Sequence, residues 1–162
     1  MKELLMLIVI MMSLLLGACS SIQEQPTNSE QSIARPDNFI LDIKSIAGKS
    51  SSSVEKVLGH PCREEKVKDG FKTHKVKYYR NGDIEIVYVQ GVADWITIQR
   101  NCNIIYGEDA LSQFGLPKMS PTFINPTAVI RWENIPNIKE LSLFPGGNGK
   151  CFYAYILVNS VP

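Results

Sequence analysis

Beyond the apolar stretch at its N-terminus, the chain first shows a pattern of apolar residues with helical spacing. Val54, Val57 and Leu58 lie at i, i+3 and i+4 spacing, which is typical of one face of a short helix. The serines just before them offer N-caps, and Gly59 is a natural residue to end the helix. The pattern therefore predicts a short helix that ends at Leu58.

Three strands are predicted after this helix. Residues 75–80, 83–89 and 94–99 alternate apolar and polar side chains with a period of two. Asn81 and Gly82, between the first two segments, are a strong signal for a two-residue hairpin turn. The three segments therefore predict an antiparallel meander.

The second half of the chain repeats this order of elements. Residues 108–114 predict a short helix that Gly115 ends, and strands are predicted over residues 128–133, 139–144 and 151–158. A helix followed by three strands thus occurs twice, which indicates an internal duplication.

The predicted fold class is α+β, with two halves that each hold a short helix and a three-stranded antiparallel meander and that share one sheet. Residues 38–101 are assigned to the first half and residues 102–162 to the second. Residues 19–37 are polar, include Pro26 and Pro36, and have no apolar period, so they predict a flexible tether. About 18 residues of coil span roughly 20–25 Å.

Residues 1–18 are typical of a signal peptide. A short charged start precedes residues 4–16, which are apolar except for Ser13. About 13 residues at ~1.5 Å each span roughly 20 Å, which is less than the ~30 Å hydrocarbon core of a bilayer. The stretch therefore suits the apolar region of a signal peptide better than a membrane span.

The four residues at 16–19, Leu-Gly-Ala-Cys, resemble the lipobox of bacterial lipoproteins. An ordinary secretory signal and an uncleaved N-terminal helix are the alternatives. The cysteine favours the lipoprotein route, in which the Cys19 thiol forms a thioether with diacylglycerol and Cys19 becomes the N-terminus. Two or more acyl chains anchor a protein stably, so we expect a protein held on a membrane and facing outside the cytoplasm. Ser20 favours the outer membrane if the cell has two membranes.

The net charge limits the possible binding partners, and the number of cysteines limits the possible disulfides. The signal holds one Lys and one Glu, so its removal leaves the formal net charge at +1, which gives no electrostatic case for binding nucleic acid. Cys62, Cys102 and Cys151 can form at most one disulfide among themselves. Cys102 to Cys151 is the predicted pair, because Cys102 lies between the halves and Cys151 opens the last strand. Buried free thiols are the alternative.

No motif identifies a reaction. The Gly-Lys-Ser run at 48–50 lacks the glycine that a phosphate-binding loop requires five positions earlier, where Ile43 stands. His60, His74 and Cys62 have neither the spacing of a zinc site nor that of a nucleophile and its base. Charged residues of predicted strands and turns usually mark a solvated face rather than a carboxylate pair for sugar hydrolysis. We therefore expect no catalytic residue, no metal and no cofactor.

Aromatic residues in the strands are the stronger functional lead. Tyr79 alternates away from Tyr78, and Trp95 alternates away from Ile96. Helices can cover only one face of a sheet, and exposed Tyr and Trp are enriched where proteins bind one another. Tyr79 and Trp95 are therefore the predicted partner-binding residues, and packing in the core is the alternative.

The first half also resembles a known group of small lipoproteins. Gly48-Lys49-Ser50, Val54 and the Val-Leu-Gly-x-Pro run at 57–61, followed by a Tyr-rich hairpin, are similar to the SmpA/BamE-type outer-membrane assembly lipoproteins. They are also similar to the tandem fold of the beta-lactamase-inhibitor-protein family. In those families two short helices pack on an antiparallel sheet. The resemblance implies that fold and a role in binding other proteins, and it transfers no functional residue.

The sequence therefore predicts a lipid-anchored, non-catalytic protein-binding module of the cell envelope. An envelope hydrolase that acts on cell-wall sugars or peptides is the alternative. A polar cleft lined by two carboxylates or by Cys and His would favour the hydrolase. An exposed aromatic sheet face would favour the binding module.

Replacing the predicted lipid attachment residue tests the anchor. Cys19→Ala removes the thiol that would accept diacylglycerol, so we expect an unlipidated and uncleaved precursor. Mass spectrometry of the N-terminal peptide of both forms measures this. A mature wild-type N-terminus without lipid would contradict the anchor.

Overall fold

The computed structural model describes residues 37–70, 72–99 and 102–158. Residues 1–36 lie outside this part, and with them the predicted signal peptide, Cys19 and most of the tether. The described elements are the 3₁₀ helices η1 (Ile43–Ser45), η2 (Arg80–Gly82) and η4 (Ala110–Phe114), the α-helix α2 (Ser51–Leu58), and the strands β1 (Arg63–Asp69), β2 (Lys72–Tyr79), β3 (Ile84–Val89), β4 (Val92–Gln99), β5 (Phe123–Asn125), β6 (Val129–Ile135), β7 (Ile138–Gly147) and β8 (Lys150–Val158).

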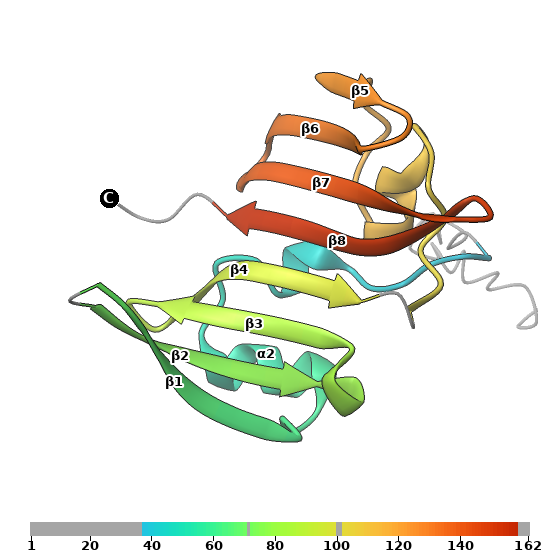
Figure 1. Ribbon diagram of the computed structural model, residues 1–162. Helices are drawn as coiled ribbons and strands as arrows, with labels where there is room; N and C mark the ends of the chain where they lie inside the picture. Colours follow the sequence, from blue (N-terminus) through green and yellow to red (C-terminus); the bar gives the residue numbers. More distant parts are fainter. Residues whose placement is uncertain (1–36, 71, 100–101, 159–162) are drawn as a thin grey trace, which may run out of the picture. The chain divides into compact units, whose positions relative to one another are not determined.

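All the described strands belong to one eight-stranded antiparallel sheet. Its strand order is β1-β2-β3-β4-β8-β7-β6-β5, so each half of the chain contributes four consecutive strands (Figure 1). The two meanders meet where β4 pairs with β8, from Trp95 opposite Leu157 to Gln99 opposite Tyr153. This seam makes a single sheet of two segments that are distant in sequence.

The predicted fold class, an α+β arrangement of two halves with one short helix and three strands each, is wrong. Among the described residues, α2 is the single α-helix, and the second predicted helix is the 3₁₀ helix η4. Each half has a fourth strand, β1 or β5, that the pattern did not predict. β1 consists of charged residues around Val67, and β5 has only three residues, so neither shows an apolar alternation.

Helix α2 confirms the predicted helix. It could be predicted because the residues that cap both of its ends are its neighbours in the sequence. The Ser50 hydroxyl accepts a hydrogen bond from the Ser53 N–H at 3.4 Å. At the other end Gly59 has φ +83°, and its N–H donates to the Glu55 carbonyl at 2.9 Å. Val54 faces the sheet and is fully buried.

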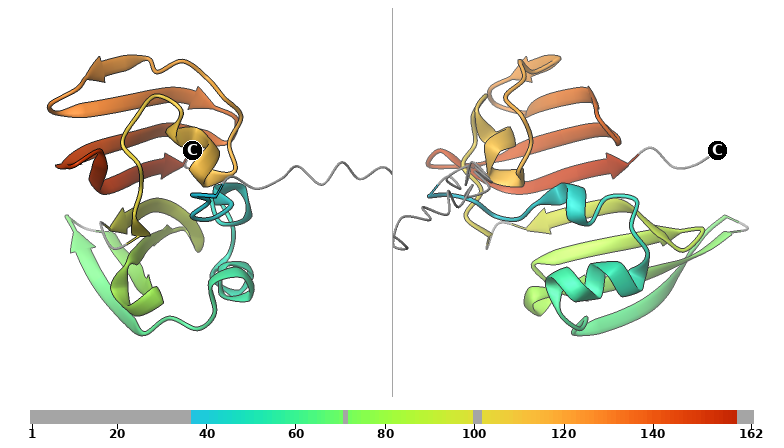
Figure 2. Two further views of the ribbon diagram at one scale, coloured as in Figure 1. Left: turned by 90° about the vertical axis from the view of Figure 1, so that its right-hand side faces the viewer. Right: turned by 180° about the vertical axis from the view of Figure 1, so that it is seen from behind.

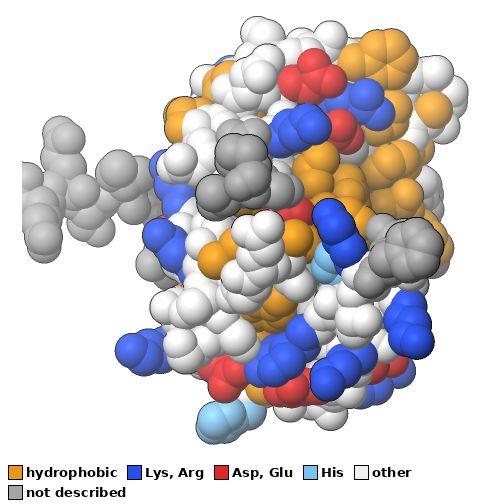
Figure 3. Space-filling model, turned by 90° about the vertical axis from the view of Figure 1, so that its left-hand side faces the viewer, with side chains coloured by type: hydrophobic (Ala, Val, Ile, Leu, Met, Phe, Trp, Pro, Cys, Tyr) orange, Lys and Arg blue, Asp and Glu red, His pale blue; other side chains and the backbone are white. Residues whose placement is uncertain are grey.

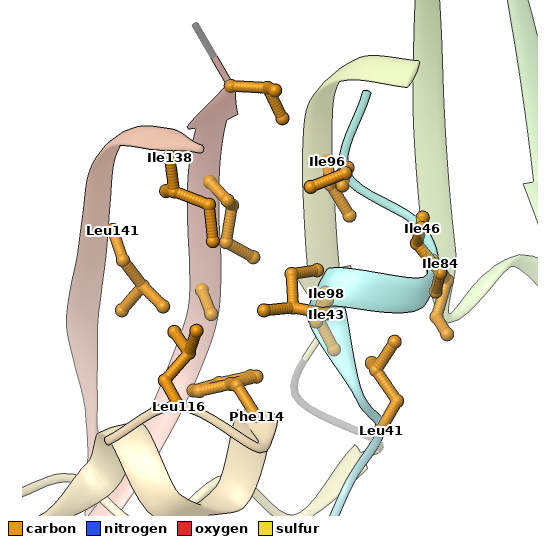
Figure 4. Close-up of a cluster of buried hydrophobic side chains, with 14 of the residues drawn as sticks. Leu41, Ile43, Ile46, Ile84, Ile96, Ile98, Phe114, Leu116, Ile138 and Leu141 are labelled. Atoms are coloured by element: carbon orange, nitrogen blue, oxygen red, sulfur yellow. The ribbon is translucent and has the colours of Figure 1, made fainter. Parts of the chain in front are cut away.

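The elements η1, α2 and η4 lie on one side of the sheet, which we call the covered face (Figure 2). Strand residues that point to this side are buried along both meanders, namely Ile84, Ile86, Tyr88, Ile96, Ile98, Ile130, Trp132, Leu141, Leu143, Ala154 and Ile156. Ile43 of η1 packs with Ile98 near the seam, and Phe114 and Leu116 complete the cluster from the other half (Figure 4). One hydrophobic core therefore spans both halves.

Truncating a residue at the seam is expected to destabilise the whole domain. Ile43→Ala removes a fully buried side chain and should lower the free energy of unfolding by about 2–5 kcal/mol. Urea denaturation measures the loss. Lys44→Ala, which changes the exposed neighbour, is the control and should change the stability by less than about 0.5 kcal/mol. Equal effects of the two variants would contradict a shared core at Ile43.

Candidate functional site

The side of the sheet opposite the helices is the candidate functional site, and we call it the open face. Cross-strand pairing places one row of its side chains as Tyr78, Glu85, Thr97, Tyr155 and Ser142 across five strands. In Figure 3, which looks at the end where β3 turns into β4, hydrophobic side chains gather towards the right, on the side of this face. The residues of this face that are half-buried rather than buried include Trp95, Phe144, Tyr153, Tyr155 and Leu157.

Three aromatic rings cluster at the β7–β8 end of the open face. The Phe144 and Tyr153 rings stack with their centroids 4.4 Å apart and an interplanar angle of 18°. The Phe152 ring meets Tyr153 edge-on at 5.8 Å and is 53% exposed. Phe152 is the extra residue of a β-bulge, because Phe144 pairs with Tyr153 while Pro145 pairs with Cys151. The bulge thus adds an exposed ring to a stacked aromatic pair.

Trp95 and Tyr155 form the centre of the open face on the two strands of the seam. Trp95 pairs with Val87 on one side and with Leu157 on the other, and its ring centroid lies 6.2 Å from that of His74. Burial raises the pKa of the Tyr155 phenol, and the nearby Glu140 carboxylate raises it further. The phenol is therefore neutral at physiological pH and can donate a hydrogen bond to a bound group.

Charged residues flank this aromatic centre on the β6–β7 side. Arg131 Nε lies 3.2 Å from Glu140 Oε1, and Arg131 Nη1 lies 4.0 Å from Glu133 Oε1. The Ser142 hydroxyl donates to the same Glu140 oxygen at 2.6 Å. These contacts hold the four polar side chains in place, and together they form a polar border beside the aromatic centre.

A second polar border lies on the β1–β3 side. The Arg63 guanidinium stands 3.8 Å from the centroid of the Tyr78 ring, and the Tyr78 hydroxyl donates to Glu65. Burial raises the pKa of Glu85, and the Glu65 carboxylate adds to the rise while Arg63 opposes it. A hollow of about 350 Å³ is lined here by Cys62, Arg63, Tyr78, Asn81, Gly82, Glu85 and Gln99.

The structure separates the two predicted partner-binding residues. Trp95 is half-buried on the open face, whereas Tyr79 is fully buried on the covered face, where its hydroxyl and that of Tyr88 are 2.9 Å apart. The prediction of Tyr79 as a partner-binding residue is therefore wrong, and this ring belongs to the core. Sequence reasoning missed Tyr153 and Tyr155, although alternation along the last strand could have placed both opposite Ala154 and Ile156.

The three described cysteines are free thiols, so the predicted Cys102–Cys151 disulfide is not formed. Cys151 is fully buried, and burial raises the pKa of its thiol to about 12. Burial also raises the pKa of the half-buried Cys102 thiol. Cys62 is exposed, and its Sγ donates to the Tyr78 carbonyl at 3.3 Å. The two raised pKa values disfavour a nucleophilic thiolate at Cys102 and Cys151.

An ion-pair cluster around the buried Lys77 lies between α2 and the sheet, on the covered face. Lys77 Nζ is 2.8 Å from Glu55 Oε1 and 2.7 Å from Glu64 Oε1, and the Ser51 hydroxyl donates to Glu55 at 3.0 Å. Burial lowers the pKa of Lys77, but the hydrogen bonds to Glu55 and Glu64 outweigh burial and leave this pKa raised. The hydrogen bond from Lys77 also lowers the pKa of Glu55. Lys77 and Glu55 therefore stay charged, and their ion pair fastens α2 to β2.

Comparisons with models of protein families, with curated proteins and with solved structures found no match to this chain. No group of three or more His, Cys, Asp and Glu side chains among the described residues is arranged to hold a metal ion. No helix within the described ranges is both long enough and apolar enough to cross a membrane. The geometry of the open face therefore carries the functional conclusion.

The contact between Tyr79 and Tyr88 predicts a measurable coupling within the core. Tyr88→Phe removes one of two buried hydroxyls that bond to each other, so it should lower the free energy of unfolding by about 1–3 kcal/mol. Adding Tyr79→Phe to this variant should cost less than it does alone, because no unpaired hydroxyl remains. Urea denaturation of the four proteins gives the coupling. Additive losses would contradict the contact.

Proposed function

We propose that the protein is a lipid-anchored, non-catalytic module of the cell envelope that binds another protein on the open face of its sheet. The aromatic surface formed by Trp95, Phe144, Phe152, Tyr153 and Tyr155 is the observation that carries this proposal. Aromatic side chains bring a large contact area at a low cost in conformational entropy. Such rings are also the residues on which binding energy at protein interfaces concentrates.

The distribution of apolar area supports this site. Phe152 is 53% exposed although it adjoins a stacked aromatic pair. Trp95, Tyr155 and Leu157 are neighbours on paired strands and keep part of their surface in solvent. Burial of this contiguous surface by a partner would contribute roughly 25 cal/mol for each Å² of apolar area. The polar borders around Arg131 and Glu85 would form the rim of the interface.

The edges of the sheet favour binding on the face rather than addition of a strand. β1 is an exposed edge strand with charged residues at six of its seven positions. The other edge, β5, has only three residues and is followed by Pro126. Charged and very short edge strands oppose pairing with another chain. A partner is therefore expected to bind on the open face of the sheet and not to add a strand at either edge.

The alternative function, an envelope hydrolase, finds less support in the carboxylates. Glu55 and Glu64 both bind Lys77, and Glu140 binds Arg131. Asp109, in a hollow of about 510 Å³ that Glu108 also lines, lies 2.6 Å from Lys118. Glycoside hydrolysis requires two carboxyl groups on opposite sides of the scissile bond. Four candidates are engaged with basic side chains instead, namely Glu55, Glu64, Asp109 and Glu140.

Site-specific photo-crosslinking tests the open face in intact cells. A benzoylphenylalanine in place of Phe152 should crosslink to one discrete protein, because position 152 lies at the aromatic surface. The same residue in place of Val57, which is 48% exposed on α2, is the matched control and should not give that product. Mass spectrometry of the crosslinked band identifies the partner. The same product from both positions would contradict a partner on the open face.

Trp95→Ala should weaken binding of the crosslinked partner by at least about 2 kcal/mol, or about 30-fold in Kd. The far-UV circular dichroism and the melting temperature should remain near those of the wild type, because the ring is only half-buried. Val57→Ala is the control for the loss of exposed apolar area. Unchanged affinity in Trp95→Ala would rule out Trp95 as an anchor.

A further inference from the structure

Strands β1 and β2 form a ribbon that extends past the rest of the sheet. β3 pairs with β2 only from Lys75 to Tyr79, whereas β1 pairs with β2 as far as Asp69 opposite Lys72. The last three cross-strand pairs of the ribbon therefore lack a third strand beside β2 and project at one end of the sheet (Figure 1). Lys68 lies in this projecting part, and the pair of Lys66 and Lys75 lies directly next to it, where β3 begins to pair with β2.

Three lysines lie together on one side of this ribbon, and we call Lys66, Lys68 and Lys75 the basic ribbon. Lys66 pairs directly with Lys75 across the two strands, and Lys68 is two residues further along β1. Lys75 Nζ lies 3.9 Å from Glu64 Oε2, a carboxylate that already binds Lys77. Lys66 and Lys68 form no ion pair with the described side chains. Like charges directly opposite each other destabilise a sheet, and a bound anionic surface would relieve this repulsion.

Protection of an edge strand does not account for the whole cluster. Lysines on an edge strand oppose pairing with other chains, which explains Lys66 and Lys68 on β1. Lys75 is on β2, which has β1 on one side and β3 on the other. A lysine there blocks no edge, and the Glu64 carboxylate, 3.9 Å from its Nζ, is shared with Lys77, so it offsets the repulsion from Lys66 only in part. The facing pair of Lys66 and Lys75 thus points to a ligand of opposite charge.

We propose that the basic ribbon docks on an anionic lipid surface. This inference rests on the proposed lipid anchor at Cys19, which would hold the domain beside that surface. Each lysine near an anionic bilayer favours the bound state about fivefold, and the attraction falls off within a Debye length of about 8 Å at physiological ionic strength. The lysine side chains must therefore contact the headgroups, and the anchor supplies the proximity.

Lysine footprinting of the lipidated full-length protein tests this docking. The wild type is reconstituted in vesicles of pure phosphatidylcholine or of phosphatidylcholine with phosphatidylglycerol, and an uncharged amine-reactive reagent is added. On the anionic vesicles we expect Lys66, Lys68 and Lys75 to react at least about fivefold more slowly than on the neutral ones, which is the effect of a single lysine near the bilayer. Near 1 M salt, where the Debye length is about 3 Å, this protection should disappear. Mass spectrometry of the peptides gives the rate at each lysine.

The exposed Lys150, in the hairpin between β7 and β8 at the opposite end of the sheet (Figure 1), is the internal control and should react equally on both kinds of vesicle. Lys66→Gln combined with Lys68→Gln should abolish the protection of Lys75. Equal rates for the basic ribbon on both vesicles, or equal protection of all lysines, would overturn the proposal. Protection by soluble polyphosphate on neutral vesicles would show a soluble anion instead and would also overturn it. Loss of the protein from neutral vesicles would refute the lipid anchor itself, and loss of the Phe152 crosslink would refute the open face.

Discussion

The pairing of β4 with β8 is the interaction on which both faces of this sheet depend. On the covered face it sets Ile96 beside Ile156 and Ile98 beside Ala154, so that one hydrophobic core spans both meanders. On the open face the same five pairs set Trp95 beside Leu157, and Thr97 beside Tyr155. A shift of one residue would turn each of these side chains to the other face. The core and the candidate binding surface therefore depend on the same register. Because burial of the core stabilises this register, it also maintains the geometry of the binding surface.

The register of the first hairpin was predictable, and it decides the position of Tyr79. A two-residue turn at Asn81 and Gly82 sets position 79 opposite Ile84, and this is the pair that the structure contains. Because Ile84 belongs to the apolar row of its strand, Tyr79 had to share the core face with it. The interpretation of Tyr79 as exposed considered alternation along one strand only. Trp95 stands opposite Val87, outside the row of Ile84 and Ile86, and its half-exposed position follows from the same rule.

The remaining differences between the predicted and the observed fold arise from tertiary contacts, which leave no recognisable pattern in the local sequence. β1 gains its place through pairing with β2, and its charged residues carry no apolar period. The second predicted helix is a 3₁₀ helix because tertiary hydrogen bonds engage it. The Gln113 side chain accepts from the Ile105 N–H at 2.8 Å and donates to its carbonyl at 2.9 Å, while the Gln113 carbonyl accepts from Ile40. Such long-range partners outweigh the weak helical preference of a five-residue segment.

The alternation of side chains also relates the two proposed contacts. Lys75 lies on the same side of β2 as Lys77, which binds Glu55 of α2, whereas His74 and Tyr78 point to the opposite side with Trp95. The basic ribbon therefore points to the side of the helices, and the aromatic surface points the other way. A bilayer that contacts Lys66, Lys68 and Lys75 would therefore lie on the side of the helices. The open face would then be directed to the aqueous side, where a partner protein could reach Trp95 and Tyr155 while the proposed anchor at Cys19 holds the domain at the membrane.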